Sequence, residues 1–238
     1  MAQTLISRAA FDLIVAEEVS GRAVYERKYR RPEWPGGASG VTIGIGYDVG
    51  AGVASREQLL NDWHGRISNA MVGALESCIG RTGAAAKALL PSVQFVDVPW
   101  DAAIAVFETR TLPKYYGLCA RALPNFEKLS FDCKGALVSL VYNRGASFSS
   151  LGDRYAEMRA IKVHMVNNNP ENIPAEFRSM KRLWVGKGLD GLLARRDREA
   201  KLFERGLTPA ASKPLPSPST KPWWQILLEA IFPKKPSV

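Results

Sequence analysis

Hydrophobic residues recur at helical spacing over most of the chain. In residues 7–19 the apolar stripe is formed by Phe11, Ile14 and Val15, and Ser7 stands before it as a suitable N-cap. The same periodicity predicts further helices over residues 55–80, 99–123, 129–142, 155–166, 174–180 and 191–205. The chain is therefore expected to be mainly helical.

A glycine-rich stretch interrupts this pattern within residues 25–50, which we expect to be irregular with short strands. Apolar residues alternate with small or polar ones from Val41 to Tyr47, as in a half-buried strand. Thr42 and Asp48 share one face of this strand but would lie about 20 Å apart in an extended chain. Both can face one cleft only if the glycines at 44 and 46 bend the strand. The predicted fold class is α+β, mainly helical with a small glycine-rich β-region near the N-terminus.

The composition changes at Thr208, where a stretch rich in Pro, Ser, Lys and Ala begins that cannot build a core. The sequence predicts one domain over residues 1–207, a linker over 208–222 and a flexible apolar tail segment over 223–238. Within the tail, Trp223–Phe232 is too short to span a bilayer. Its paired tryptophans and the lysines after it suit a membrane surface or a docking partner, and a disordered tail with an apolar patch is the alternative.

The net charge of +9 is high for 238 residues and favours a polyanionic partner. The basic residues are scattered, and no helix-turn-helix, zinc-finger or RNA-binding signature accompanies them, so no nucleic acid is expected as a partner. The N-terminus lacks the basic start and apolar run of a secretory signal. We expect the protein to be made in the cytoplasm without a recognisable signal peptide.

The cysteines and histidines do not form a metal-binding pattern. Cys78, Cys119 and Cys133 stand far apart and support neither a disulfide framework nor a metal site, so free buried thiols are expected. His64 and His164 have no partners at a spacing typical of a metal site or a catalytic triad. The sequence predicts no metal and no organic cofactor.

Glu18 continues the apolar stripe of the first helix at its C-terminal end. Partial burial and the negative end of the helix would both disfavour the ionised carboxylate and raise its pKa. A carboxyl group that keeps its proton near neutral pH can act as a general acid. The alternative is a surface glutamate near a helix end, because charged residues are rarely buried unless they are paired.

Several other positions have both a functional and a structural interpretation. Asp48 is either a site carboxylate or a turn residue, because aspartate favours turns for local reasons. Asn143 and Arg144 end an apolar helix and can project into a cleft as polar contacts for a sugar. Trp184 can stack on a sugar ring or fill the core. The arginines that begin at Arg195 can form simple ion pairs along a helix.

Together these elements resemble the phage-type lysozyme family, the muramidases that cut peptidoglycan between N-acetylmuramic acid and N-acetylglucosamine. The similarity lies in islands within residues 7–206, and the most specific island comprises Glu18, Tyr25 and Thr42-Ile43-Gly44-Ile45-Gly46. Similarity to the family's central helix and to its late Gly-Leu and Arg-Arg-x-x-Glu pattern is carried by Ala136-Leu137, Asn143-Arg144-Gly145, Gly188-Leu189, Gly191-Leu192 and Arg195-Arg196-Asp197-Arg198-Glu199.

One position departs from the family pattern. Phage lysozymes typically have a catalytic aspartate two residues after the tyrosine, where this chain has Arg27. The lysozyme-like bacteriocin pesticin has its catalytic aspartate six positions after the threonine, which is the spacing of Thr42 and Asp48 here. The resemblance therefore implies Asp48 as the second carboxylate, ahead of Glu33 and Glu26.

The resemblance also implies a lysozyme-like fold and a set of roles. Glu18 would be the general acid, Asp48 would orient a water and stabilise the oxocarbenium-like state, and Thr42 would help to hold that water. Inversion at the anomeric carbon is the implied outcome. Tyr25 and Tyr47 are the expected substrate contacts, in addition to the asparagine, arginine and tryptophan named above.

The implied substrate is bacterial peptidoglycan, reached at the cell wall or in the periplasm after export or lysis. A phage endolysin and an antibacterial toxin both fit, and a toxin would have an immunity protein as a further partner. Two other classes remain open. One is a non-catalytic protein that binds peptidoglycan or the envelope, and the other is a membrane-active protein that works through its C-terminal tail.

Overall fold

The computed structural model describes residues 5–208, so the predicted linker and the tail with Trp223–Phe232 lie outside the described residues. The helices are Arg8–Val19 (α1), Arg22–Lys28 (α2), Val49–Gly52 (α3), Arg56–Trp63 (α4), Asn69–Leu75 (α5), Gly83–Val93 (α6), Trp100–Val106 (α7), Leu112–Ala122 (α8), Phe131–Arg144 (α9), Ala156–Val166 (α10), Ile173–Ser179 (α11) and Asp190–Leu207 (α12). The strands are Thr42–Ile43 (β1) and Tyr47–Asp48 (β2). Short 3₁₀ turns and one π-helical segment, Phe107–Thr111, connect them. The expectation of a mainly helical protein with a small β-region is confirmed.

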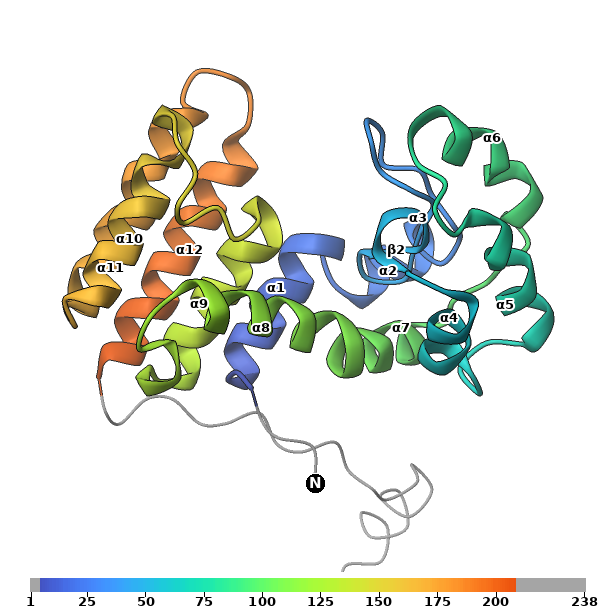
Figure 1. Cartoon of the computed structure of the whole chain (residues 1–238), viewed down its shortest axis with the longest axis horizontal. Helices are drawn as coiled ribbons and strands as arrows, with labels where there is room; N and C mark the ends of the chain where they lie inside the picture. The colour runs from blue at the N-terminus through green and yellow to red at the C-terminus, as the bar shows by residue number, and fades with distance from the viewer. Residues whose placement is uncertain (1–4, 209–238) are drawn as a thin grey trace, which may run out of the picture.

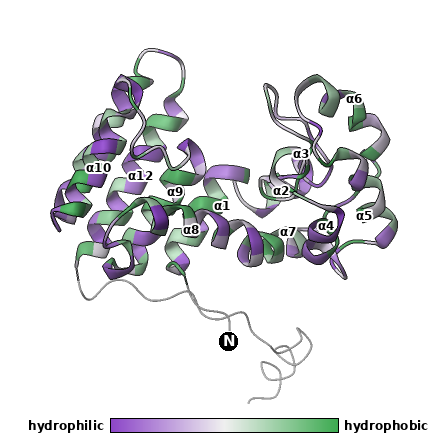
Figure 2. Cartoon of the chain, viewed as in Figure 1, coloured by the Kyte–Doolittle hydropathy of each residue, from purple (hydrophilic) through white to green (hydrophobic). Residues whose placement is uncertain are grey.

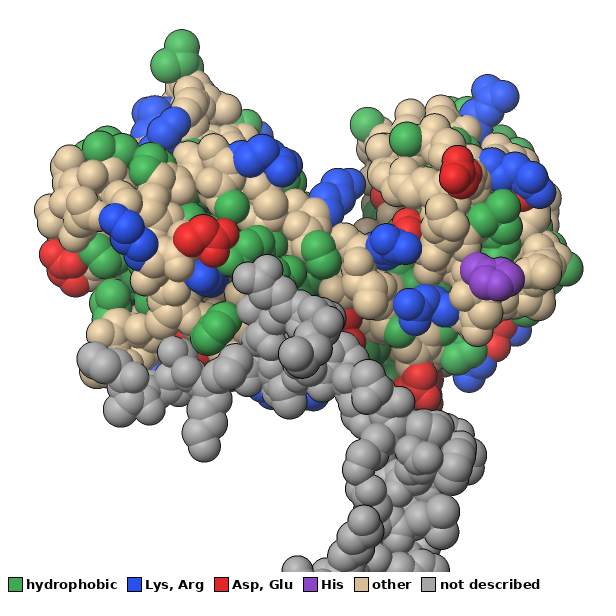
Figure 3. All heavy atoms as spheres, turned by 60° about the horizontal axis from the view of Figure 1, so that its bottom comes forward, with side chains coloured by type: hydrophobic (Ala, Val, Ile, Leu, Met, Phe, Trp, Pro, Cys, Tyr) green, Lys and Arg blue, Asp and Glu red, His purple; other side chains and the backbone are tan. Residues whose placement is uncertain are grey.

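The elements form two lobes joined by long helices (Figure 1). The N-lobe holds α2 to α6 and the β-hairpin, and the C-lobe holds α9 to α12. Helix α1 lies between the lobes, and α7 and α8 run as one rod from the N-lobe to the C-lobe. The space-filling view shows the surface hollowed into a notch between the lobes (Figure 3).

Helix α9 forms the centre of the C-lobe. All ten of its residues from Asp132 to Val141 are buried, and it packs against α1, α8 and α12. A helix buried on every side is a core helix, although α9, like the other helices, carries both hydrophilic and hydrophobic residues (Figure 2). At Gly135 a Cβ atom would lie 2.1 Å from the Cβ of Ala10. The absence of a side chain at this position is what allows α1 to lie so close to α9.

Local sequence signals set several helix ends. The Ser7 hydroxyl accepts the Ala10 N–H at 3.1 Å, as the N-cap prediction requires. At the C-terminal end of α9, Gly145 has a φ of +74° and donates its N–H to the Val141 carbonyl. These caps satisfy backbone groups that have no partner inside a helix.

Two sequence predictions about helices were wrong, and one helix was not predicted. The single helix over residues 55–80 is divided into α4 and α5, because Gly65 turns at a φ of +70° and Ser68 caps a new helix. Helix α2 forms partly inside the stretch that we expected to be irregular, and α6, which contains Pro91, was not among the predicted helices.

The predicted helix over residues 99–123 forms, but it changes its winding in the middle. Pro113 has no N–H to donate to the carbonyl of Thr109, and its ring crowds that carbonyl. The turn before it widens into the π-helical segment Phe107–Thr111, where Thr109 bonds the Ala105 carbonyl through its own hydroxyl at 2.7 Å. Wider turns of this kind shift the direction of the side chains that follow, and they often occur at functional sites.

The three cysteines are free and buried, as expected from their spacing. Burial raises the pKa of the Cys133 thiol to about 11, and it raises the pKa of Cys119 further. Within residues 5–208, no helix is both long and apolar enough to cross a bilayer.

The contact between α1 and α9 leads to a test of the packing. Gly135→Ala should lower the free energy of unfolding by about 1–3 kcal/mol, because the new methyl group overpacks the interface with Ala10. Gly73→Ala is the matched control, since Gly73 also lies inside a helix but has open space where its Cβ would be. This control should raise stability by up to about 1 kcal/mol. The measurement is urea unfolding, and equal midpoint concentrations of urea for the two variants would contradict the proposed packing.

Candidate active site

The hairpin brings together residues that a straight strand would separate. Gly44 and Gly46 adopt φ values of +59° and +65°, and the turn pairs Thr42 directly with Asp48 in an antiparallel register. Cross-strand partners lie only about 5 Å apart between Cα atoms. The predicted bend at the two glycines is therefore confirmed. It places the candidate hydroxyl and the candidate carboxylate side by side.

A second backbone segment flanks Thr42 on its other edge. Glu33 donates its N–H to the Thr42 carbonyl at 2.9 Å and accepts the Thr42 N–H at 2.8 Å. Thr42 therefore has a carboxyl-bearing residue as its partner on each side. Burial raises the pKa of Glu33, although this side chain is largely exposed. Glu26 is different, because it pairs with Arg22 on the exposed face of α2 at 2.8 Å.

Asp48 is a turn and capping residue, which is one of the two interpretations that the sequence allows. One carboxylate oxygen accepts the Ala51 N–H at 2.8 Å and caps α3, and the other accepts the Gly40 N–H at 3.1 Å. A carboxylate has about four lone-pair sites, so these two bonds leave acceptor positions free for a water or a ligand. The capping bonds also fix the orientation of the carboxylate. A turn role and a role in a site are compatible here.

Glu18 lies in the last turn of α1 with 23% of its side chain exposed. Burial raises the pKa of Glu18, and the guanidinium of Arg195, which donates to its carboxylate at 2.8 Å, opposes this shift without cancelling it. The negative charge of Glu17 adds a smaller upward effect. The elevated pKa that the position on the apolar stripe predicts is therefore present.

Arg195 belongs to a buried ionic cluster, which comprises Arg195, Arg196, Glu199 and Ser139. Arg195 donates to Glu199 at 3.2 Å and to the carbonyl of Ser139 at 3.1 Å, and the Ser139 hydroxyl donates to Glu199 at 2.6 Å. Arg196 adds a bond to Glu199 at 2.8 Å, and burial lowers its pKa to about 10. The expected ion pairs along this helix exist, but they lie inside the protein rather than on its surface.

Two tyrosines interact electrostatically with the candidate acid, Glu18. The rings of Tyr115 on α8 and Tyr142 on α9 have centroids 4.4 Å apart. Burial raises the pKa of Tyr115, and the negative charges of both Glu18 and Asp48 raise it further. The Tyr115 phenol therefore responds to both carboxyl charges, and its side chain lines the same cavity as Asp48.

The Tyr142 side chain can reach the hairpin only because residue 46 is a glycine. Its hydroxyl donates to the Ile45 carbonyl at 3.3 Å, and a Cβ on Gly46 would lie only 1.9 Å from that hydroxyl oxygen. Glycine is therefore required at this position both for the positive φ and for the approach of the tyrosine. Sequence reasoning missed both tyrosines. The only available signal was that Tyr142 precedes the Asn-Arg-Gly end of α9.

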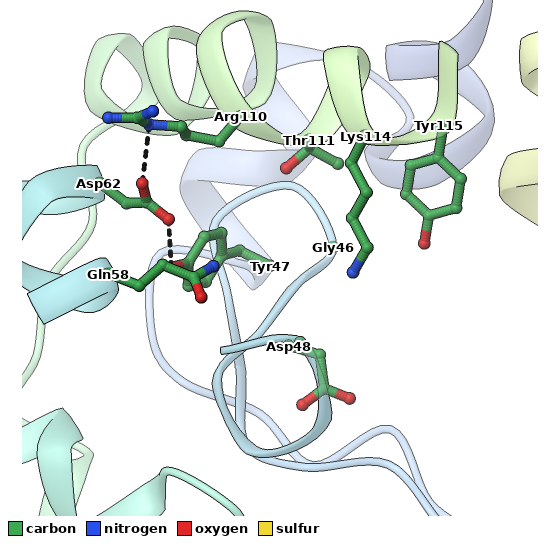
Figure 4. Close-up of a pocket in the computed structure, with 10 residues that line it drawn as sticks. Gly46, Tyr47, Asp48, Gln58, Asp62, Arg110, Thr111, Lys114 and Tyr115 are labelled. Carbon is green, nitrogen blue, oxygen red and sulfur yellow. Dashed lines mark hydrogen bonds and ion pairs between the residues drawn. The ribbon is translucent and has the colours of Figure 1, made fainter. Parts of the chain in front are cut away.

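A cavity of about 90 Å³ opens between the hairpin, α4 and the rod of α7 and α8 (Figure 4). It is lined by Gly46, Tyr47, Asp48, Gly52, Gln58, Asp62, Arg110, Thr111, Lys114 and Tyr115. On one side of the cavity the Tyr47 hydroxyl donates to Asp62 at 2.7 Å, and Arg110 pairs with Asp62 at 2.7 Å. These contacts attach the hairpin to α4 and to the π-helical segment.

The structure contradicts the expected sugar contact at Tyr25. This side chain is completely buried, its hydroxyl donates to the Val98 carbonyl at 2.9 Å, and its ring packs edge-on against Trp100. Tyr47 is also a poor sugar contact, because it is 8% exposed and its hydroxyl is bound to Asp62. Both tyrosines hold the N-lobe together instead.

The remaining predicted contacts form a separate cluster at the end of α9. Asn143 is exposed and accepts a hydrogen bond from Arg196 at 3.3 Å. Arg144 donates to the carbonyl of Arg154, and its guanidinium lies 5.1 Å from the centre of the Trp184 ring. A second guanidinium, from Arg196, lies 5.8 Å from the same ring. None of the three predicted residues lines the hairpin cavity, and the Trp184 ring is already in contact with two cations of the chain.

Comparison with known proteins adds one family. Residues 15–110 match a family described as a domain of unknown function (DUF8812). The matched span begins in α1 before Glu18, contains the hairpin, and ends at Arg110 in the π-helical segment. Less than half of the chain is covered, and the tyrosines of α8 and α9 and the ionic cluster lie beyond the match. A search of curated proteins finds no match for this chain.

The ionic cluster leads to a prediction about stability. Arg195→Met should lower the free energy of unfolding by about 3–5 kcal/mol, because it leaves Glu18 without its cation and removes one of the cations that pair with buried Glu199. Arg198→Met is the matched control on the same helix, since Arg198 is exposed and pairs with Glu17. It should cost less than about 1 kcal/mol. Thermal and urea unfolding of both variants measure the difference, and similar losses would contradict the role of the buried cluster.

The raised pKa of Glu18 predicts a pH dependence. Because its pKa is higher in the folded protein than in the unfolded chain, ionising Glu18 destabilises the folded state as the pH rises through the folded-state pKa. Glu18→Gln has no such titration. The stability of Glu18→Gln relative to the unchanged protein should therefore increase as the pH rises above about 4, the pKa of a glutamate in an unfolded chain. Urea unfolding at several pH values tests this, and a difference that stays constant with pH would refute the assignment.

Proposed function

We propose that the protein is a glycoside hydrolase with a lysozyme-like fold that cuts the β-1,4 bond between N-acetylmuramic acid and N-acetylglucosamine in peptidoglycan. One observation carries this proposal. Glu18 has a raised pKa with only 23% of its side chain exposed, a glycine turn pairs Asp48 with Thr42, and the charges of both carboxyl groups raise the pKa of the Tyr115 phenol. Two carboxyl groups in different environments are what acid and base catalysis of glycoside cleavage requires.

Glu18 is the proposed general acid. It gives its proton to the glycosidic oxygen as the bond from that oxygen to the anomeric carbon breaks. Burial raises the pKa of Glu18 and so favours its protonated form, while the bond from Arg195 fixes its orientation and stabilises the carboxylate that remains after proton transfer. The opposing effects of burial and Arg195 suit a group that must alternate between both protonation states.

Asp48 and Thr42 are proposed to position the attacking water. The water adds to the anomeric carbon and gives one proton to Asp48, so that the net reaction splits one water across the bond. The free acceptor sites of Asp48 and the neighbouring Thr42 hydroxyl supply partners for that water. Inversion at the anomeric carbon is the proposed outcome. Glu33 is the second candidate for the base, because it flanks Thr42 on the opposite edge.

The surface of the protein is consistent with a long acidic polymer. The notch between the lobes offers an open path for an extended chain (Figure 3), and the net charge of +9 favours the encounter with peptides and envelope polymers that carry carboxylates and phosphates. A phage endolysin or an antibacterial toxin, the latter with an immunity protein as partner, would act on such a wall after export or lysis.

The second candidate function is a protein that binds peptidoglycan without cutting it. The observation in its favour is that both oxygens of Asp48 already accept backbone N–H groups, which is enough to explain an aspartate at this position. Binding to sacculi without release of new reducing ends would identify this function. Lysis that survives loss of Glu18 but is lost on truncation after residue 207 would instead identify a membrane-active tail.

The decisive test is mass spectrometry of purified peptidoglycan digested with the unchanged protein and with Glu18→Gln. We expect new reducing ends on N-acetylmuramic acid, formed about 10²- to 10⁴-fold more slowly by the variant, because a general acid contributes a factor of this size. Glu26→Gln is the control, since Glu26 lies in an exposed pair on α2. A folded Glu18→Gln protein that retains more than half of the rate would exclude the proposed role.

A parallel comparison identifies the second carboxylate. Asp48→Asn should lower the rate by a similar factor if Asp48 activates the water, whereas Glu33→Gln should retain most of the rate. The reverse order would transfer the role to Glu33. Asn can keep the cap of α3, but its amide nitrogen cannot accept the Gly40 N–H that one Asp48 oxygen accepts. Thermal unfolding of Asp48→Asn must therefore accompany the kinetics, with an expected loss of about 1–3 kcal/mol for the unpaired N–H.

A further inference from the structure

The cavity beside Asp48 contains a cation whose charge the described protein does not use. Lys114 is exposed at the start of α8, and within residues 5–208 it makes no ion pair, whereas the neighbouring Arg110 is paired with Asp62. A Cβ placed on Gly52 would lie 3.8 Å from the Lys114 ammonium and 3.7 Å from the Cβ of Asp48. Lys114 and Asp48 therefore both border the space that Gly52 leaves open.

Two hydroxyl groups share this space with the ammonium. Thr111, Lys114 and Tyr115 stand on α8 and at the end of the π-helical segment before it, and Figure 4 shows all three projecting toward the hairpin. Residues three and four positions apart share one face of a helix, which explains why they converge. The floor of the cavity includes Gly46 and Gly52, which add no side chains. The cavity thus combines one unpaired positive charge with two hydrogen-bond donors.

The size and charge of the cavity limit what it can bind. Its volume of about 90 Å³ is well above the roughly 10–15 Å³ that a cavity needs to hold one water, which leaves room for a small planar group. The carboxylate of Asp48, which also lines the cavity, would repel a doubly charged phosphate more strongly than a singly charged carboxylate. An ammonium and two hydroxyl groups are also suitable donors for the two oxygens of a carboxylate.

We propose that this cavity, the Lys114 site, binds a carboxylate of the glycan substrate. The inference rests on the proposed function, since peptidoglycan bears carboxylates on the lactyl-peptide arm of its muramic acid residues. The carboxylate comes either from the stem peptide or from the lactyl group of a strand that has lost its peptide. Binding there places a muramic acid residue next to Asp48 and discriminates against neutral polymers of N-acetylglucosamine.

Binding can be measured without cleavage in a Glu18→Gln background. The probes are purified sacculi, sacculi whose carboxyl groups have been converted to methylamides, and glycan strands stripped of their peptides. Adding Lys114→Gln should weaken binding to native sacculi about tenfold, because one charge-assisted hydrogen bond is lost. A tenfold change corresponds to about 1.4 kcal/mol of binding free energy. On amidated sacculi the same substitution should have almost no effect, because the partner charge is gone.

Lys201→Gln is the matched control, because Lys201 is an exposed lysine of α12 on the C-lobe. It removes the same charge but should weaken binding to both kinds of sacculi equally and only slightly. An equal penalty for Lys114→Gln on native and amidated sacculi would overturn the proposal, because it would show that Lys114 contributes only general attraction. A penalty that persists on peptide-free strands assigns the lactyl carboxylate, and a penalty lost on them assigns the stem peptide.

A second variant tests the cavity without touching the charge. Gly52→Ala puts a methyl group into the space between Lys114 and Asp48, and Gly52 does not have the positive φ that would make alanine strained. It should reproduce the selective loss on native sacculi without lowering the melting temperature. If folded Gly52→Ala binds native sacculi as well as the unchanged protein does, while Lys114→Gln shows the selective loss, the carboxylate does not enter the cavity and the proposal is wrong.

The kinetic readout separates this inference from the proposed function. In the protein with Glu18 intact, Lys114→Gln should raise KM about tenfold with kcat nearly unchanged, the result for a contact made equally in the ground and transition states. If the unchanged protein releases no reducing ends, the proposed hydrolase activity fails. The binding comparison between native and amidated sacculi still decides the Lys114 site in that case.

Discussion

The guanidinium of Arg195 links the three helices on which the candidate acid depends. It reaches Glu18 on α1, the backbone of Ser139 on α9 and Glu199 on its own helix α12. Burying a charge is unfavourable unless it is paired and hydrogen-bonded, and Arg195 makes enough bonds to remain inside the protein. The same cation moderates the effect of burial on Glu18. The acidity of the candidate site and the packing of the C-lobe therefore depend on one side chain.

The hairpin contributes the complementary half of the site, and it also depends on contacts from other elements. Tyr142 from α9 bonds the carbonyl of Ile45 over Gly46, while Asp62 from α4 binds the hydroxyl of Tyr47. A two-stranded ribbon is marginally stable alone, so these contacts from both lobes keep it in place. Because Tyr142 is also within the field of Glu18, the end of α9 is the point at which the acid and the hairpin meet.

The sequence was informative where a local pattern determines the structure. The stripe of Phe11 and Ile14 predicted α1 and the partial burial of Glu18, and the glycines at 44 and 46 predicted the bend that pairs Thr42 with Asp48. It was uninformative where tertiary packing decides. A tyrosine has both an apolar ring and a polar hydroxyl, so nothing local distinguishes the buried Tyr25 from a ligand contact. Lys114 and Tyr115 reach the hairpin only because α8 packs beside it, and the division after α4 required knowledge of the turn at Gly65.

The buried thiols have a consequence for where the protein can persist. All three cysteines lie inside the fold as thiols, and burial raises their pKa values, which suppresses the reactive thiolate. The architecture between α1 and α12 thus requires no disulfide to hold it together and presents little thiolate for oxidation. Such a fold would be insensitive to whether its surroundings are reducing or oxidising, and it could cross from one environment to the other without refolding around new covalent links.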